Sequence, residues 1–98
     1  AWRHEASFRL EAYLAIVMVP LGLWLGDGAL EKLALAGTPL LVLLAELLNS
    51  AIEAVVDLVS PGHNELAGRA KDLGSAATFI AMALVVLTWV LVLGQRLV

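Results

Sequence analysis

A stripe of polar residues interrupts an otherwise apolar stretch in the middle of the chain. Residues 43–59 read LLAELLNSAIEAVVDLV. The polar side chains in this stretch are Glu46, Asn49, Ser50, Glu53 and Asp57. At about 100° per residue, all five fall within one arc of roughly 100° on a helical wheel. Such carboxylates, together with others from separate segments at the same membrane level, suit a hard cation such as Mg²⁺ bound with substrate phosphates.

The acids lie at different depths along the expected helix. Glu46 is about 10 Å further along the axis than Glu53. An ionisable group at membrane depth is costly, and it normally faces a bundle interior or a water-filled cavity. A structural hydrogen-bond network between helices, or an oligomer contact, is the alternative interpretation, but three carboxylates need a cation nearby. The stripe therefore favours a functional site.

Three apolar stretches can position this stripe. Residues 73–94 contain no charged side chain over 22 positions, and a helix of that length, about 33 Å, crosses a hydrocarbon core of about 30 Å. Residues 12–26 and 33–56 predict two further spans, the first with Tyr13 and Trp24 near its ends as interfacial anchors. The expected breaks are GDG at 26–28 and SPGH at 60–63, after which NELAGRAKDLGSAA begins the last helix.

Composition agrees with a membrane protein. The chain has 98 residues, of which 61% are hydrophobic, and its mean hydropathy is +0.92. A single soluble domain of this size could not bury so much apolar surface. The net charge of −3 argues against a nucleic-acid partner. The fold class is thus an all-α integral membrane protein, with a short amphipathic surface segment at 1–11 before three transmembrane helices, in one domain at 1–98.

Basic residues set the expected orientation. With three spans, the N-terminus and the 57–72 region lie on one side of the membrane, together with the acids Glu5, Glu65 and Asp72. Four basic residues lie on that side, Arg3, Arg9, Arg69 and Lys71, and two on the other, Lys32 and Arg96. An excess of Lys and Arg marks the cytoplasmic side. The residues alone therefore predict a small three-span protein with an acidic, metal-dependent site at the inner membrane face.

Three sequence blocks then resemble a known family. The small prokaryotic diacylglycerol kinases are similar to this chain, in residue types and spacing, at AELLNSAIEAVVD (45–57), NELAGRAKDLGSAA (64–77) and EASFRLE (5–11). The chain has no G-x-x-x-x-G-K-[ST] and no kinase-type glycine loop. The resemblance implies an ATP-dependent lipid kinase that converts diacylglycerol to phosphatidic acid. It also implies a homotrimer with active sites at the cytoplasmic face of the bacterial inner membrane.

The resemblance also implies roles for individual residues. By position, Glu46 is the general base near the lipid hydroxyl, and it is grouped with Asn49 and Asp72 as catalytic. Glu5 and Glu53 hold Mg²⁺ and thereby the ATP phosphates. The residues expected to contact the nucleotide are Gly62, His63, Asn64, Lys71 and Asp72. Those expected to line the path of the lipid substrate are Ser7, Phe8, Arg9, Glu11, Glu46 and Ser75.

Two departures and two alternatives accompany this resemblance. The family usually has an aromatic residue and then His before EL, where this chain reads HN. It also usually begins with a further amphipathic helix, whereas this chain starts at Ala1, at the block that follows that helix. Undecaprenol kinase of the same family is the first alternative for function. A small cation channel or transporter subunit is a distant one, because residues 33–45 carry no charge to extend an ion path.

Overall fold

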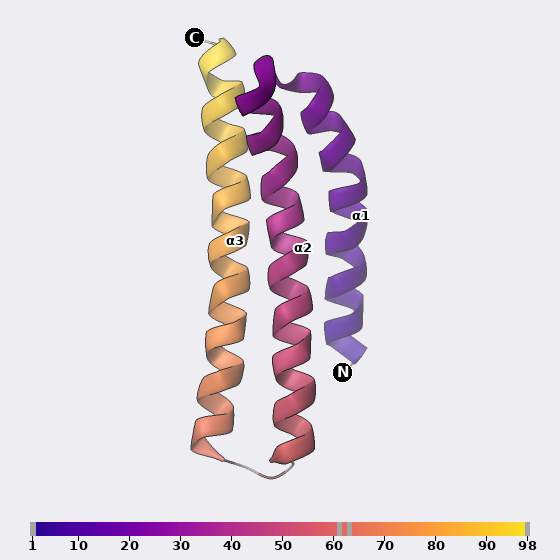
Figure 1. Cartoon of the computed structure of the whole chain (residues 1–98), viewed down its shortest axis with the longest axis vertical. Coiled ribbons are helices and arrows are strands. Elements are labelled where there is room, and N and C mark those ends of the chain that lie inside the picture. The colour runs from indigo at the N-terminus through magenta and orange to yellow at the C-terminus, as the bar shows by residue number, and fades with distance from the viewer. Residues whose placement is uncertain (1, 61, 63, 98) are drawn as a thin grey trace.

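The chain folds into three helices. The computed structural model describes residues 2–60, 62 and 64–97, and the side chains of residues 9–60, 62 and 64–96. Helix α1 spans Trp2–Leu25, α2 spans Gly28–Val59 and α3 spans Glu65–Leu97 (Figure 1). All regular structure in these residues is helical, as the sequence predicts.

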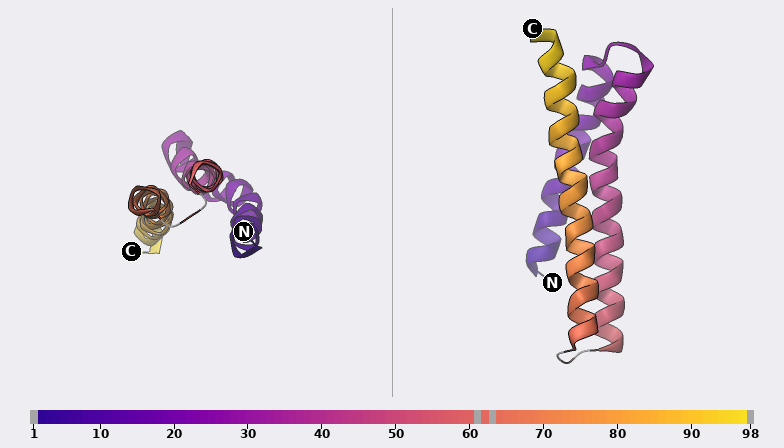
Figure 2. Two further views of the ribbon diagram at one scale, coloured as in Figure 1. Left: turned by 90° about the horizontal axis from the view of Figure 1, so that it is seen from below. Right: turned by 90° about the vertical axis from the view of Figure 1, so that its left-hand side faces the viewer.

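Helix α2 is the central element of the bundle. Both α1 and α3 pack against it along their lengths. Seen along the helices, α2 stands between the other two at the apex of a V, so that α1 and α3 face each other across an open side (Figure 2). The polar stripe lies on α2, and the open side of the V is where residues from all three helices can meet.

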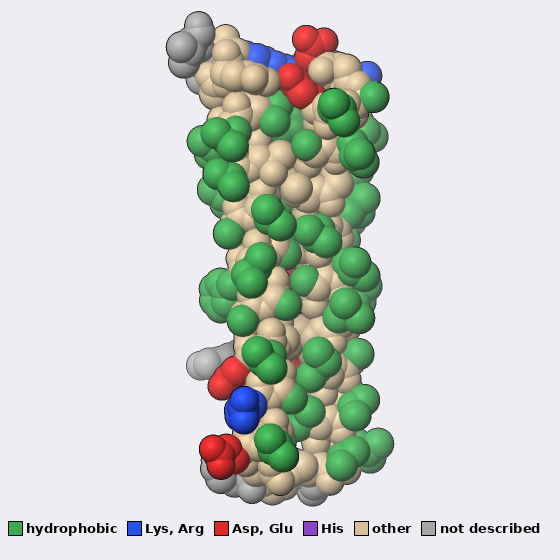
Figure 3. All heavy atoms as spheres, turned by 60° about the vertical axis from the view of Figure 1, so that its left-hand side comes forward, with side chains coloured by type: hydrophobic (Ala, Val, Ile, Leu, Met, Phe, Trp, Pro, Cys, Tyr) green, Lys and Arg blue, Asp and Glu red, His purple; other side chains and the backbone are tan. Residues whose placement is uncertain are grey.

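The surface is apolar over most of its length. Helices α2 and α3 are each long and apolar enough to cross a membrane. On the face shown in Figure 3, apolar side chains lie along the middle of the molecule and charged groups lie near its two ends. The buried apolar core in the described residues is small: Ala15, Leu35, Ala36, Val42 and Ala81. Its exposed leucines, isoleucines and valines would be unfavourable in water, which agrees with the apolar character of α2 and α3.

Helix α1 differs from its prediction. The sequence suggests a surface segment at 1–11 followed by a separate span at 12–26, but the structure has one helix from Trp2 to Leu25. No residue type in this stretch breaks a helix before Pro20. Within the described residues, α1 is not among the helices that qualify as membrane spans by length and composition. A third span therefore stays a prediction.

Close contact between α1 and α2 depends on a glycine. Gly22 is buried, and a Cβ atom at this position would lie 2.8 Å from the backbone carbonyl carbon of Leu35. Leu35 itself is fully buried. The missing side chain lets the two backbones approach, which is a common way to pack helices in lipid.

A proline on α2 leaves one backbone carbonyl of that helix without a donor, and a side chain of α3 supplies the donor. Pro39 has no N–H, so the carbonyl of Leu35, four residues earlier, has no partner within its own helix. The indole N–H of Trp89 donates to this carbonyl at 3.0 Å. An unpaired backbone carbonyl inside an apolar bundle costs free energy. Trp89 therefore stabilises the α2–α3 contact at the proline.

Replacing Trp89 by Phe should reveal this bond. We expect Trp89→Phe to lower the free energy of unfolding by about 1–2 kcal/mol, because the Leu35 carbonyl loses its donor. Denaturant unfolding in detergent micelles measures the change. Trp24→Phe is the matched control, since Trp24 is 78% exposed. In a Pro39→Ala background, residue 39 regains its N–H and the loss should shrink; an equal loss in both backgrounds would contradict the explanation.

The end of the bundle that contains the α1–α2 turn is fixed by one carboxylate. Glu31 accepts hydrogen bonds from the backbone N–H of Asp27 at 3.0 Å and from Gln95 Nε2 at 3.0 Å. It also pairs with Arg96 Nη2 at 2.6 Å. The Asp27 N–H, followed by Arg96, lowers the pKa of Glu31. These contacts join the turn to the C-terminal end of α3.

Candidate active site

A polar cavity lies on the open side of the V. Its volume is about 200 Å³, and it is formed by side chains from all three helices. The lining residues are Glu11 of α1, Glu46, Asn49 and Glu53 of α2, and Ser75, Thr78, Phe79 and Met82 of α3. Three of the four polar stripe residues that precede Asp57 therefore face one cavity. The fourth, Ser50, does not line it.

The two deepest stripe residues are buried. Glu46 is 5% exposed and Asn49 is 4% exposed. The carboxyl group of Glu11 lies next to that of Glu46, and Glu11 Oε2 accepts no hydrogen bond from the described residues. Two adjacent carboxyl groups repel each other when both are charged, so a shared proton or a bound cation stabilises them. The pair has the composition of a site for proton transfer or cation binding.

Asn49 is held between an acid and a glycine. Its side-chain nitrogen is 3.5 Å from Glu53 Oε1, at the limit of a hydrogen bond. Its side-chain oxygen is buried and accepts no hydrogen bond from the described residues. That oxygen lies against the backbone of Gly74 on α3, where a Cβ atom would overlap it. A buried oxygen without a donor costs free energy, so the position of Asn49 depends on its packing against Gly74 and not on a hydrogen bond of that oxygen.

A methyl group at residue 74 should disturb this arrangement. We expect Gly74→Ala to reduce phosphoryl-transfer activity by at least about tenfold, because small displacements of site groups have effects of this size or larger. Gly68→Ala on the same helix is the matched control, since its Cβ atom would meet nothing within 4 Å. Steady-state kinetics on both variants measures the difference. Equal activities would show that the Gly74–Asn49 contact does not position the site.

A lysine side chain lies near the end of the stripe. Lys71 Nζ of α3 pairs with Asp57 Oδ1 of α2 at 2.6 Å. The hydrogen bond to Asp57, with smaller contributions from the charges of Asp57 and Glu53, raises the pKa of Lys71. The ammonium group is therefore positively charged at neutral pH, beside the acidic cavity and ahead of the uncharged part of α3. A group of this kind can attract an anionic substrate.

Comparison with known proteins identifies the family of this chain. A model of the prokaryotic diacylglycerol kinase family matches residues 1–93. The chain belongs to the prokaryotic diacylglycerol kinase family. It is 45% identical over 96 residues to diacylglycerol kinase of Escherichia coli strain K12, covering 98% of this chain and 79% of that protein. The resemblance identified from the sequence blocks is confirmed.

Other diacylglycerol kinases align over a similar length. The Haemophilus influenzae protein is 45% identical over 89 residues, which cover 91% of this chain and 75% of that protein. The Helicobacter pylori strain 26695 protein is 35% identical over 97 residues, which cover 99% of this chain and 73% of that protein. Similarity thus extends across all three helices, including every element that contributes to the cavity.

The structure of this diacylglycerol kinase family member brings part of the predicted site together. Glu11, Glu46, Asn49, Glu53 and Ser75 line one cavity. Arg9, Asp72 and Gly62 are exposed, and none of them lines that cavity. The side chains of Glu5, Ser7, Phe8 and His63 lie outside the described residues.

Asn64 has a role that position alone did not suggest. Its side-chain oxygen accepts hydrogen bonds from the backbone N–H groups of Leu66 at 2.9 Å and Ala67 at 3.2 Å. This is the pattern of a helix N-cap. Asn64 therefore fixes the start of α3, whether or not it also contacts a nucleotide.

Sequence reasoning missed three lining residues from the apolar run of α3. Thr78, Phe79 and Met82 complete the cavity wall opposite α2. Thr78 is buried and its hydroxyl donates to the carbonyl of Gly74 at 3.3 Å. The signal available was their spacing, since Thr78 and Met82 lie one and two helical turns after Gly74.

Proposed function

We propose that this protein is an ATP-dependent diacylglycerol kinase, which transfers the γ-phosphate of ATP to the free hydroxyl of diacylglycerol and forms phosphatidic acid. The observation that carries the proposal is the cavity in which Glu11, Glu46 and Glu53 meet Asn49 in the bundle of a family member. Phosphoryl transfer needs positioned groups and neutralised phosphate charge more than covalent chemistry by the protein. A buried acidic cavity between apolar helices supplies positioned groups to a lipid alcohol, and its carboxylates can hold the cation that neutralises the phosphates.

In the proposed mechanism, Glu46 acts as the general base. Its carboxylate takes the proton of the lipid hydroxyl as the hydroxyl oxygen bonds to the γ-phosphorus and the bond to ADP breaks. A base must lie within hydrogen-bond distance of the proton that it removes, and Glu46 is the deepest acid of α2, where a lipid hydroxyl can arrive from the membrane. Asn49 supports Glu53 from the next turn, and Ser75 lines the lipid side of the cavity.

The donors in the cavity fit a magnesium ion. Mg²⁺ is usually bound by one or two carboxylates together with substrate phosphates and water. Glu53, which lines the cavity, supplies one carboxylate, and Glu5 is the second proposed ligand. No group of three or more metal-binding side chains occurs in the described part of the chain, which does not include the side chain of Glu5. When bound, Mg²⁺ neutralises phosphate charge during transfer.

The nucleotide is proposed to bind at the end of the bundle where α2 and α3 are connected. Lys71 lies close enough to Glu53 of the acidic cavity to feel its charge, and it can exchange its contact with Asp57 for a phosphate oxygen. Asp72 lies beside Lys71 on the exposed surface. Gly62, His63 and Asn64, from the connection, complete the proposed nucleotide contacts. Arg9, Ser7 and Phe8 are proposed to meet the lipid at the mouth of the cavity.

The proposed setting is the bacterial inner membrane. Helices α1, α2 and α3 would each cross it, with the N-terminus and the α2–α3 connection in the cytoplasm. Two observations support this arrangement: the three helices run antiparallel to their neighbours (Figure 1), and α2 and α3 carry long apolar surfaces. A homotrimer, as the family resemblance implies, would cover further apolar surface.

An assay with one lipid tests the proposed function. Purified full-length chain in detergent micelles is given dioleoylglycerol and ATP labelled at the γ-phosphate, with Mg²⁺ or with EDTA in excess. We expect labelled phosphatidic acid with Mg²⁺ and none with EDTA. Absence of labelled lipid in both conditions, from protein that is folded by circular dichroism, would overturn the proposal.

A further inference from the structure

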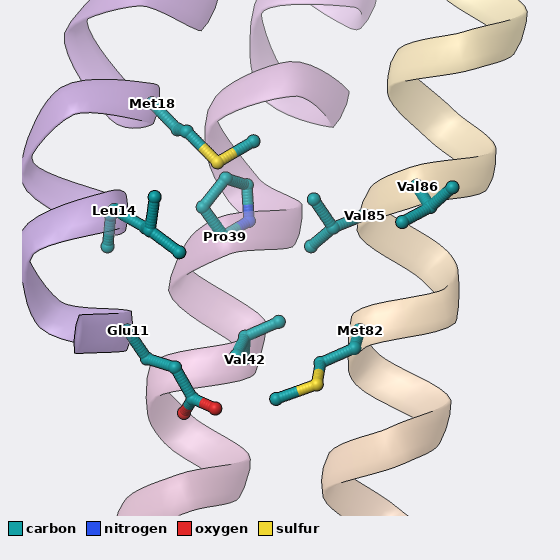
Figure 4. A pocket seen from close by; sticks show the side chains of 9 residues that line it. Glu11, Leu14, Met18, Pro39, Val42, Met82, Val85 and Val86 are labelled. Atoms are coloured by element: carbon teal, nitrogen blue, oxygen red, sulfur yellow. The ribbon is translucent and has the colours of Figure 1, made fainter. Parts of the chain in front are cut away.

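A second, apolar cavity continues from the polar one along the open side of the V. It has a volume of about 270 Å³ and shares Glu11 and Met82 with the polar cavity. Figure 4 shows Glu11 near Val42 and Met82 at one end, and Met18, Pro39 and Val86 at the other. Apart from Glu11, every side chain that lines it is apolar. The polar and apolar cavities are thus two sections of one groove.

The direction of this groove matches an amphiphile with one polar end. Its polar section faces the end of the bundle with the α2–α3 connection, and its apolar section extends about two helical turns, or about 10 Å, towards the middle of α1. A lipid in a bilayer has the same arrangement, with its polar group at the surface and its chains towards the centre. Binding sites for such molecules are mostly apolar, with few polar groups that fix the orientation.

We infer that the apolar section binds one acyl chain of the diacylglycerol whose hydroxyl lies at Glu46, and that Val86 sets which chains fit. This inference rests on the proposed function. Continuity with the acidic cavity is the reason to choose the substrate's own chain as the occupant. Val86 lies at the end of the groove away from Glu11 (Figure 4), where a chain of increasing length arrives last.

Val86 can be enlarged without disturbing the core. It is 63% exposed, so a larger side chain can be accommodated towards the membrane as well as into the groove. Val90 is a matched control, because it lies one turn further along α3, is 62% exposed and is not among the residues that line the groove. A comparison of the two phenylalanine variants separates an effect on the groove from an effect on the surface.

The test is a series of chain lengths. KM and kcat are measured for dibutyryl-, dioctanoyl- and dioleoylglycerol with the full-length wild type, Val86→Phe and Val90→Phe. We expect Val86→Phe to raise KM progressively with chain length, by about tenfold for dioleoylglycerol, as for a change of one or two methylenes in an apolar pocket. KM for dibutyrylglycerol and for ATP should change less than about twofold, and Val90→Phe should resemble wild type.

Other outcomes are decisive against the inference. An increase in KM that is the same at every chain length, or one that Val90→Phe shares, overturns it. A change in oligomeric mass with Val86→Phe, without dependence on chain length, would assign the groove to a second copy of the chain. If Val86→Phe does not fold, Val86→Ala takes its place and should improve KM for the methyl-branched diphytanoylglycerol relative to dioleoylglycerol. If wild type phosphorylates none of these lipids, the proposed function fails instead.

Discussion

Replacing Glu46 by Gln is expected to reduce the rate of lipid phosphorylation by about 10²–10⁴-fold, the usual contribution of a general base. The amide has nearly the same shape but cannot accept the hydroxyl proton. Because Glu46 is 5% exposed and lines the cavity at its lipid end, nucleotide affinity should remain close to wild type. Steady-state kinetics and binding of a labelled ATP analogue measure the two properties separately.

The result for Glu46 has an internal control. Gln removes the repulsion between Glu46 and Glu11 and keeps the side-chain volume, so the folded state should be at least as stable as wild type. The proposed role fits a variant that binds nucleotide, has a free energy of unfolding at least equal to that of wild type, and has lost turnover. If turnover falls by less than about threefold, Glu46 is not the general base, because the loss of such a base costs far more.

Replacing Glu53 by Gln is expected to change the response to metal. The Mg²⁺ concentration for half-maximal activity should rise roughly tenfold or more, since even groups that only orient a metal ligand change metal affinity by about 10–100-fold. Affinity for Mg-ATP should fall in parallel, because Glu53 is proposed to hold the ion that carries the phosphates. Titration of activity with Mg²⁺ at saturating lipid measures the first effect.

A second acid provides the control for Glu53. Glu65→Gln, on the exposed first turn of α3, removes a carboxylate near the same end of the bundle without touching the cavity. Its Mg²⁺ dependence should match that of wild type. If Glu53→Gln and Glu65→Gln show the same curve, Glu53 is not a ligand of the ion, and the metal must be sought elsewhere in the chain.

Much of the fold followed from the pattern of charges. The 22 uncharged residues at 73–94 predicted a long helix, and α3 extends beyond them in both directions. The wheel correctly predicted that Glu46, Asn49 and Glu53 share one face of a helix, since α2 is regular throughout that stretch. Asp57, on the same stripe, turns instead to Lys71, because the stripe continues past the end of the cavity.

Other features depend on contacts between different helices. The periodicity of a sequence does not predict which helices are in contact. Neither the Trp89 bond at Pro39 nor the contact of Gly74 with Asn49 can be predicted from spacing, since each joins residues of different helices. The approach of Glu11 to Glu46 has the same origin. Continuity of α1 from Trp2 through residue 11 was not predicted, because charged residues there looked like a separate surface segment, although they do not interrupt a helix.

The choice of lipid tests the central claim most directly. Equal mole fractions of dioleoylglycerol and undecaprenol are placed in the same detergent micelles with the full-length protein, Mg²⁺ and ATP labelled at the γ-phosphate, and the two products are separated and counted. The proposed function predicts that most of the label enters phosphatidic acid and that Glu46→Gln removes it. Preferential labelling of undecaprenyl phosphate would contradict the account.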